Sequence, residues 1–320
     1  MTSQTHPRTG APLLSAIVVS YNTREMTLEC LRVLSDELKG INAEIWVVDN
    51  ASNDGSAPAI RAAFPEVQLL ENADNAGFGA ANNAAMERAS GAYFLLLNSD
   101  AFPRPGAISS LLEQMDAHPR AGAIGPKLLN RDGSLQRSCW RFPSPSQSWL
   151  ENLGVSALLR GRTRWGNYYH WAHDTEREVD FVIGACLLVK REVWEKIGGF
   201  DPAFWMYAEE TDWQKRMKAA GHEIWFSPRA EVEHWGGASG GTVAPRTRDA
   251  FFGSQEIYIL KHHGASGLRR FRAANKVGNT FRIVLWALFF LVRPQKRAQA
   301  REKMQFFRYL LRRRSGAGLQ

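Results

Sequence analysis

The sequence predicts an α/β protein with a doubly wound, mostly parallel sheet and a C-terminal extension that is helical, basic and amphipathic. In the first 130 residues, apolar strand-like runs alternate with segments of helical periodicity, which is typical of a parallel sheet covered by helices. Several of these runs end in polar residues. The net charge is +8, yet the last 60 residues alone hold 15 Lys or Arg and one acid, Glu302, so the chain has two parts of opposite character.

The first elements form a βαβ unit. The runs at 13–22 and 43–52 are apolar and rich in β-formers, and the segment 23–38 between them has helical spacing after an N-cap candidate, Thr23. The alternation continues in the order helix, strand, helix, strand, over residues 57–64, 67–72, 77–89 and 92–100.

Polar residues follow the strands of this alternation. Because ligands bind at the carboxyl ends of parallel strands, we expect these residues to meet at one edge. Asp49 can accept hydrogen bonds from a nucleobase or ribose, and Asp54 with Gly55 forms a turn able to wrap around it. Gly77 and Gly79 stand at the mouth of a helix, where backbone can approach a phosphate.

These loops contain no Lys to balance a diphosphate, and they lack the glycine spacings of dinucleotide and P-loop sites. A divalent cation held by carboxylate oxygen would supply the balance. Asp100 follows the apolar run 94–97 after Asn98 and Ser99, so a rigid buried strand would carry it to the edge. The sequence therefore predicts Mg²⁺ or Mn²⁺ at Asp100.

The motifs VVSYN, VVDNASNDGS, NAGFGAANN and LLLNSDAF occur in the order found in family 2 glycosyltransferases of the GT-A fold, which the chain resembles over about residues 14 to 242. NSD resembles the DxD metal motif, with Asn98 in place of the first Asp and one charge fewer. The resemblance implies a nucleotide-diphospho-sugar donor. The residues assigned to the donor are Ser20, Tyr21, Asn22, Asp49, Asn50, Ser52, Asp54, Asn75, Gly77, Phe78, Gly79, Asn82, Asn98 and Ser99.

An acid cluster follows the aromatic run FWMY. Glu209, Glu210 and Asp212 begin a helical pattern, where they could act as N-terminal caps or as catalytic acids and bases. The family's ED-x-D element is similar and implies that Glu210 is the general base of an inverting transfer, with Glu209 as the alternative. All three acids are candidate catalytic residues.

His234 follows a short strand, and without context such a residue is usually packed or exposed. Family members have a His here that contacts the metal or diphosphate, which makes His234 a candidate partner of Asp100. Trp205, Tyr207 and Trp235 are the candidate sugar-stacking residues for the acceptor.

The combination of these motifs most resembles that of bacterial rhamnosyltransferases. This resemblance implies dTDP-rhamnose as donor and a glycan or polyprenyl-diphosphate-linked acceptor in the synthesis of cell-wall or O-antigen polysaccharide. Two other classes stay open, a nucleotide-sugar pyrophosphorylase and a non-catalytic carbohydrate-binding scaffold. The "SYN" ending of the first strand disfavours the former, and the presence of Asp100, Glu210 and His234 disfavours the latter.

The basic tail contains two apolar segments, 281–293 and 303–314, each flanked by Arg or Lys and too short to span a bilayer. We interpret them as interfacial helices that bind an anionic membrane surface, although packing on the main domain is the alternative. No motif supports nucleic-acid binding.

Four divisions follow from these patterns. We expect a flexible N-terminus at 1–12, a nucleotide-sugar-binding half at 13–130, an acceptor-binding and catalytic half at 131–245, and a membrane-associating extension at 246–320. Three dispersed cysteines indicate neither a disulfide framework nor a zinc site, and the N-terminal residues show no secretory signal. We therefore expect a cytoplasmic protein, peripherally associated with the inner face of the cell membrane.

Overall fold

The computed structural model describes residues 11–155, 168, 171–236 and 245–313, with the side chains of 245–247 left out. Most of the predicted flexible N-terminus and the end of the extension lie outside this range. The chain forms two compact units, one of residues 1–142 with 171–248 and one of 143–170 with 249–320. The expected division had placed 143–170 in the acceptor-binding half.

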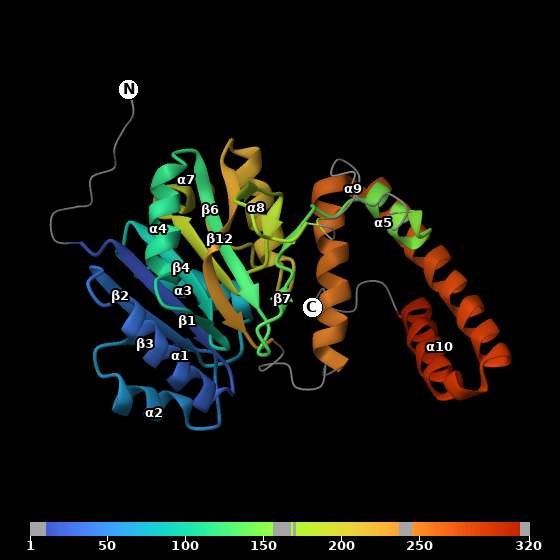
Figure 1. Ribbon diagram of the computed structural model, residues 1–320, viewed down its shortest axis with the longest axis horizontal. Coiled ribbons are helices and arrows are strands. Elements are labelled where there is room, and N and C mark those ends of the chain that lie inside the picture. Colours follow the sequence, from blue (N-terminus) through green and yellow to red (C-terminus); the bar gives the residue numbers. More distant parts are fainter. Residues whose placement is uncertain (1–10, 156–167, 169–170, 237–244, 314–320) are drawn as a thin grey trace. The chain divides into compact units, whose positions relative to one another are not determined.

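The first unit is built around one large sheet (Figure 1). Its strands are β1 (Leu14–Ser20), β2 (Ala43–Asp49), β3 (Gln68–Glu71), β4 (Tyr93–Asn98), β5 (Ala101–Pro103), β6 (Ala121–Leu129), β7 (Leu135–Gln136), β9 (Arg177–Glu178), β11 (Cys186–Lys190) and β12 (Glu223–His234), while β8 (Cys139–Trp140) pairs with β10 (Phe181–Val182). Its helices are α1 (Arg24–Glu37), α2 (Ser56–Ala63), α3 (Phe78–Met86), α4 (Ala107–Ala117), α7 (Arg191–Ile197) and α8 (Glu209–Ala219).

The sheet order β3-β2-β1-β4-β11-β6-β12-β5 confirms the predicted doubly wound arrangement. Strands β1 to β4 are mutually parallel, β6 and β12 are parallel to each other, and β11 and β5 run antiparallel to their neighbours. The register aligns Ser20 with Asp49 and Val19 with Asn98, so the polar ends of β1, β2 and β4 share one edge.

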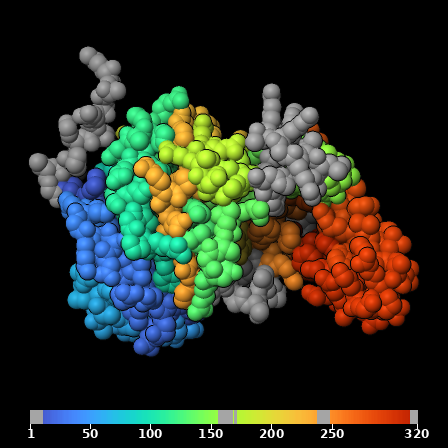
Figure 2. All heavy atoms as spheres, in the orientation of Figure 1, coloured from blue at the N-terminus to red at the C-terminus, as the bar shows by residue number. Residues whose placement is uncertain are grey.

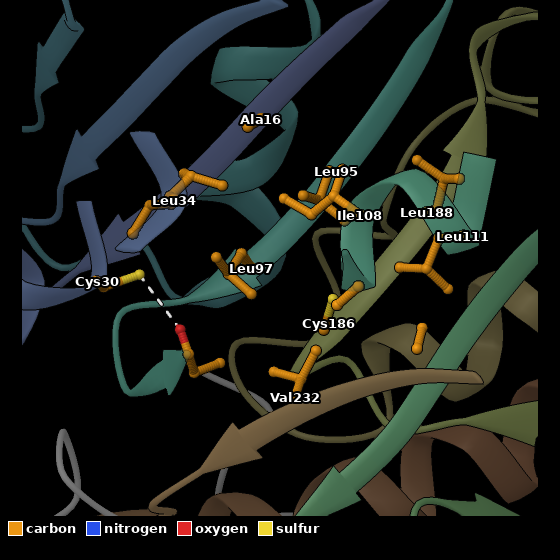
Figure 3. Packing of buried hydrophobic residues seen from close by; sticks show 14 of the residues in the cluster. Ala16, Cys30, Leu34, Leu95, Leu97, Ile108, Leu111, Cys186, Leu188 and Val232 are labelled. Carbon is orange, nitrogen blue, oxygen red and sulfur yellow. Dashed lines mark hydrogen bonds between the residues drawn. The ribbon is translucent and has the colours of Figure 1, made fainter. Parts of the chain in front are cut away.

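Helices cover both faces of this sheet, which is why β1 and β4 are mostly buried and largely apolar up to their polar last residues. On one face, buried residues of α1 and α4 pack on alternate residues of β4 and β11 (Figure 3). On the other face, Phe94 of β4 meets Trp194 of α7 edge-on at 5.6 Å. Cys30 of α1 donates a hydrogen bond to the carbonyl oxygen of Ala101 at 3.4 Å, beneath the turn that follows β4 (Figure 3).

The second unit is helical in the residues described. It contains α5 (Pro145–Asn152), α9 (Pro245–Val292), a 3₁₀ turn (Pro294–Lys296) and α10 (Arg297–Arg312). α9 is broken at Gly264, whose φ of +67° interrupts the helix. α5 packs closely on α9, because a methyl group added at Gly278 would lie 2.0 Å from the side-chain oxygen of Asn152.

Polar contacts connect α10 to α9 within this unit. Tyr309 donates a hydrogen bond to Asp249, and Arg313 lies 3.8 Å from Glu256. Beyond the break, α9 and α10 lie side by side (Figures 1 and 2), with Arg282 5.8 Å from the ring of Phe307. The basic tail therefore folds as part of a helical unit.

The later part of α9 carries an apolar stripe on its exposed surface. Helical spacing of three and four residues relates its members to one another. The stripe consists of Val277, Phe281, Val284, Leu285, Leu288, Phe289, Leu291 and Val292, between 37% and 74% exposed. Across the described ranges, no helix combines the length and apolar character needed to span a bilayer.

Candidate active site

Asp49 lies at the carboxyl end of β2 and is only 3% exposed. Its Oδ2 accepts a hydrogen bond from the backbone N–H of Ser52 at 3.0 Å. Its Oδ1 is buried and has no hydrogen-bond partner among the residues that the structure describes. Because a buried carboxylate oxygen is costly without a partner, this atom is suited to accept a hydrogen bond from a ligand.

The loops that follow β1 and β2 brace each other. The N–H of Asn22 donates to Ser52 Oγ at 2.9 Å, and Asn22 Oδ1 accepts from the N–H of Asn53 at 2.9 Å. Asp54 accepts hydrogen bonds from the N–H groups of Arg24 and Ser56. Burial acts to raise the pKa of Asp54, but these hydrogen bonds outweigh it and hold that pKa below its ordinary value. Asp54 thus fixes the starts of α1 and α2.

Buried hydroxyl groups support the turn after β4. Ser99 Oγ lies 3.1 Å from Thr23 Oγ1, and Thr27 Oγ1 lies 2.9 Å from Ser20 Oγ. All four side chains are at most 6% exposed. Ser20 and Ser99, both predicted donor residues, therefore hold the backbone of the edge in place. Tyr21, the neighbour of Ser20, is partly exposed at the same edge.

Asn50 holds the loop before α3. Its Oδ1 accepts from Asn72 Nδ2 at 2.9 Å and from the N–H of Ala76 at 3.2 Å, and its Nδ2 donates to Asn75 Oδ1 at 2.9 Å. With its amide fully engaged and 2% exposure, Asn50 positions the loop that carries Asn75 and Gly77.

That loop is held tightly against Trp205. A methyl group added at Gly77 would lie 2.0 Å from the carbonyl oxygen of Trp205, and Gly77 has φ +88° and ψ 169°. The N–H of Phe78 donates to the same oxygen at 3.2 Å, and Trp205 Nε1 donates to the carbonyl of Asn75 at 3.1 Å. At Gly79 a methyl group would come within 2.9 Å of Phe200. Packing against the later part of the chain thus requires both glycines.

The second turn of α3 adds two asparagines. Asn82 is 1% exposed, its Nδ2 donates to the carbonyl of Phe78 at 2.9 Å, and its Oδ1 has no hydrogen-bond partner within the described residues. Asn83 Oδ1 accepts from the N–H of Phe200 at 2.9 Å while its Nδ2 donates to the Phe200 carbonyl at 2.8 Å. Asn83 therefore connects α3 to the loop before α8.

Asp100 and His234 meet at the edge, as the metal prediction requires. His234 Nε2 lies 3.4 Å from Asp100 Oδ1 and 3.4 Å from Asn98 Nδ2, and the Asp100 and His234 side chains are 7% and 12% exposed. Two ligands of one divalent cation, each about 2.1 Å from it, lie about 3 Å apart at a right angle, close to the observed separation.

The described part of the chain has no cluster of three or more His, Cys, Asp or Glu able to hold a metal ion. A site with two protein ligands still fits Mg²⁺ or Mn²⁺, because such ions are commonly bound by one or two side chains together with substrate phosphates and water. The residues present therefore fit a divalent cation that is completed by a diphosphate.

Glu209 and Glu210 begin α8 beside the loop before α3. Glu209 is 4% exposed, its Oε2 lacks a hydrogen-bond partner within the described ranges, and its Cβ would lie 3.6 Å from a methyl group at Gly79. Burial raises the pKa of Glu209 well above its ordinary value, and the charge of Glu210 raises it further. Burial also raises the pKa of Glu210, although backbone N–H groups, including that of Gly184, oppose the rise.

The residues before this acid pair have an unusual backbone. Tyr207 and Ala208 have φ values of +69° and +64°, in the left-handed region that non-glycine residues rarely adopt. Tyr207 is 37% exposed, and burial followed by the charges of Glu209 and Glu210 raises the pKa of its hydroxyl. The strained turn brings an aromatic side chain next to both acids, as an acceptor-binding residue would need.

Asp212 is arranged differently from the two glutamates. It is fully buried, and its Oδ2 accepts from Arg216 Nε at 2.9 Å. Arg216 in turn donates to the carbonyls of Ile197 and Gly199, which ties α8 to the loop after α7. The geometry of Asp212 fits a structural ion pair better than the catalytic role predicted for it.

Trp235 follows His234 and lies beside Asp100. Its backbone N–H donates to the backbone carbonyl of Asp100 at 3.0 Å, and its ring packs on Phe102 with centroids 4.7 Å apart. The guanidinium of Arg131 lies 4.3 Å from the centre of the Trp235 ring. One face of the indole is thus partly covered by a cation.

Sequence reasoning missed Asn83, Phe200 and Gln136. Asn83 stood in the quoted run NAGFGAANN, but nothing in that run indicates a partner 117 residues away. Gln136 follows a turn signal, Asp132-Gly133, which predicts a hairpin without indicating what the hairpin contacts. Gln136 Oε1 lies 2.6 Å from His234 Nδ1.

The chain is similar in sequence and in fold to known proteins. Residues 15–198 match the model of the family described as Glycosyl transferase family 2. A Mycobacterium tuberculosis protein named N-acetylglucosaminyl-diphospho-decaprenol L-rhamnosyltransferase is 32% identical over 235 residues, which are 68% of this chain and 75% of that protein.

Two further proteins are similar. The low-salt glycan biosynthesis hexosyltransferase Agl10 of Haloferax volcanii is 25% identical over 64% of this chain and 61% of its own length. Among solved structures, the mannosyltransferase PcManGT from Pyrobaculum calidifontis, in complex with GDP-Man and Mn²⁺, aligns with a TM-score of 0.55 at 18% identity, covering 96% of this chain and 88% of that one.

Proposed function

The chain belongs to glycosyl transferase family 2 and has its GT-A fold, and on this basis we propose that it is an inverting glycosyltransferase that moves L-rhamnose from dTDP-rhamnose to a hydroxyl group of a lipid-linked glycan. Use of a nucleotide-sugar donor comes with the family. The rhamnosyl donor, the acceptor and the roles of individual residues are proposals.

A short series of contacts that runs from Glu210 to Asp100 and His234 carries the proposal. A methyl group at Gly184 would lie 3.5 Å from Glu210 Cβ, and the carbonyl of its neighbour Ala185 accepts a hydrogen bond from the N–H of Asn98 at 2.9 Å. Asn98 in turn contacts His234, the partner of Asp100. These contacts support the proposal that a base at Glu210 and a diphosphate at Asp100 and His234 act on one sugar.

The donor would lie along the edge formed by β1, β2 and β4. Asp49 Oδ1, buried and without a partner in the described residues, would accept a hydrogen bond from the base or ribose. Asp100 and His234 would hold the divalent cation, whose charge would stabilise the leaving diphosphate. Asn22, Ser52 and the other bracing residues would keep the loops in one geometry, which limits the cost of ordering them on binding.

Glu210 is the proposed general base. It is more exposed than Glu209, so an acceptor hydroxyl can reach it, and burial raises its pKa toward the range useful for proton transfer near neutral pH. Glu210 would take the hydroxyl proton as the acceptor oxygen attacks the anomeric carbon. The bond to the nucleoside diphosphate breaks on the opposite face, so a single displacement inverts the anomeric centre.

Glu209 would remain protonated beside it. Two adjacent buried carboxylates resist being charged together, and the deeper one has the stronger rise in pKa. A neutral Glu209 leaves Glu210 as the only charge of the pair. Tyr207 and Trp205 would present aromatic surface to the acceptor sugar, because flat rings pack against the apolar faces of sugars.

The rhamnosyl specificity and the lipid-linked acceptor draw support from the mycobacterial relative, at 32% identity. The second unit adds independent support for a lipid surface. We propose that the apolar stripe of α9 enters an anionic membrane interface while the arginines near it, such as Arg293 and Arg297, bind headgroups. The protein would then act at the inner face of the cell membrane.

The test combines donor screening with substitution of the acids. Release of nucleoside diphosphate is measured with dTDP-rhamnose, UDP-sugars and GDP-mannose, with and without a polyprenyl-diphosphate-linked acceptor. Glu210→Gln should lower kcat by about 10²–10⁴ with little change in donor affinity, whereas Glu209→Gln should cost much less. Near-normal turnover of Glu210→Gln would remove the base assignment, and donor binding without turnover in the unsubstituted protein would favour a scaffold.

A further inference from the structure

A hairpin outside the predicted site contacts His234, which together with Asp100 forms the proposed cation site. Residues 130–134 connect β6 to β7 through a turn in which Gly133 has φ +79°. Asp132 Oδ1 accepts hydrogen bonds from both the N–H and the hydroxyl of Ser134. The hydroxyl proton of Ser134 is therefore used, and its oxygen can only accept from other groups.

This fixes the orientation of the Asn130 amide. Asn130 Nδ2 lies 2.9 Å from Ser134 Oγ, which accepts, and 3.5 Å from the carbonyl of Leu135, which can only accept. The nitrogen of the amide must face them, so Asn130 Oδ1 points the other way, toward Gln136.

The same reasoning fixes the Gln136 amide. Gln136 Nε2 lies 3.0 Å from Asn130 Oδ1 and 3.1 Å from the carbonyl of His234. Both are acceptors, so the amide nitrogen must face them and Gln136 Oε1 must face His234 Nδ1, 2.6 Å away. An amide oxygen cannot donate, and the proton of this short contact therefore belongs to the imidazole.

We propose that Gln136 is a positioning residue that keeps the proton of His234 on Nδ1, so that Nε2 presents its lone pair beside Asp100 as a cation ligand. The hydrogen bond at one ring nitrogen decides which nitrogen is free to bind a metal. This inference rests on the proposed cation site, but the position of the proton can be measured without any cation.

Two further groups contact the ring at Nε2: the amide of Asn98 agrees with this assignment, whereas Asp100 Oδ1, 3.4 Å away, would accept a proton from Nε2 and so opposes it when no cation is bound. Asn98 Nδ2 lies 3.4 Å from His234 Nε2, and an amide N–H beside this nitrogen needs an acceptor there. Asn98 occupies the place of the first Asp in the family's metal motif. A cation that binds Nε2 must displace this contact, so the amide of Asn98 competes weakly for the same lone pair.

The experiment uses the full-length protein, free of metal, at pH 8, where an ordinary imidazole is neutral. Long-range ¹H–¹⁵N NMR identifies the protonated nitrogen of His234, with the signal assigned by its loss in His234→Gln. Mn²⁺ affinity is measured separately, from the electron paramagnetic resonance signal of free Mn²⁺.

The variants are Gln136→Leu, which removes the acceptor, and Gln136→Glu, which retains one. Gln147→Leu is the matched control, because Gln147 lies on α5 and its side-chain nitrogen donates to Glu151 Oε1 at 3.1 Å. We expect an Nδ1 proton in the unsubstituted protein and in Gln136→Glu, and a shift toward Nε2 protonation in Gln136→Leu. Mn²⁺ affinity of Gln136→Leu should fall about 10- to 100-fold, and Gln147→Leu should change neither readout.

Three results overturn the inference. The first is an unsubstituted protein whose His234 is not protonated on Nδ1 alone, which needs no variant to be folded. The second is a folded Gln136→Leu with an unchanged proton position. The third is weaker Mn²⁺ binding in Gln136→Leu while the proton of His234 stays on the same nitrogen, because the hairpin would then affect cation binding through its shape and not through the position of the proton. If the unsubstituted protein binds no Mn²⁺ but the proton moves as expected, the cation site fails and the role of Gln136 in holding the proton stands.

Discussion

Gly77→Ala should break the contact between the loop before α3 and Trp205. The new methyl group would lie 2.0 Å from a backbone carbonyl oxygen, whereas ordinary contact begins at 3.4 Å, so one segment must move by about 1.4 Å. The φ and ψ of Gly77 also lie in a region that is essentially limited to glycine, which costs about 1–3 kcal/mol. Overpacking adds about 1–3 kcal/mol.

The expected total loss in the free energy of unfolding is therefore about 2–6 kcal/mol. Gly133→Ala is the matched control, because Gly133 also has a positive φ but has nothing within 4 Å of an added methyl group. It should lose only about 1–2 kcal/mol. Urea denaturation followed by tryptophan fluorescence gives both values.

The clash is with backbone, so Trp205→Ala cannot relieve it, and the double variant should be no more stable than Gly77→Ala. If Gly77→Ala loses no more stability than Gly133→Ala, the close contact is not a constraint. The inference that packing against Trp205 requires a glycine at position 77 would then be wrong.

Three further outcomes are expected. Folding raises the pKa of Glu209, so the contribution of Glu209 to stability is full at pH values below its ordinary pKa of about 4.5 and is lost as the pH rises through the raised pKa. Glu209→Gln should therefore reduce the loss of stability between pH 5 and pH 8. An identical loss in both proteins would contradict the burial argument. Asp100→Ala should abolish transfer and weaken Mn²⁺ binding while the fold survives, an expectation that fails if EDTA-treated enzyme keeps full activity. Leu288→Glu with Leu291→Glu should reduce flotation with anionic liposomes without unfolding α9, and unchanged flotation would remove the membrane assignment.

The fold could be predicted from sequence because its strands are continuous apolar runs with polar ends. Runs such as 94–97 leave few alternatives to a buried strand, and the order of helices and strands then fixes a doubly wound sheet. The antiparallel direction of β11 and the short strand β5 were not predicted, because strand direction depends on where the chain returns and not on local pattern.

Residue types at the edge were predictable, but their partners were not. The pattern indicated glycine at 77 and 79 for approach to a phosphate, while the structure gives each a close contact with Trp205 or Phe200, more than 120 residues later. Asp212 matched a motif, yet its ion pair with Arg216 depends on burial that the sequence does not reveal. Gln136 could not be found, since only the folded hairpin brings it to His234.

The thiol of Cys30 makes the turn after β4 accessible to chemical measurement. Its Sγ donates to the carbonyls of Asn98 and Ala101, on either side of Ser99 and Asp100, and burial raises its pKa. An alkylating reagent can react only after α1 separates from this turn. The rate of alkylation therefore measures local opening beneath the turn where we propose that the diphosphate binds, and any ligand that stabilises this turn should slow the reaction, whatever sugar that ligand carries.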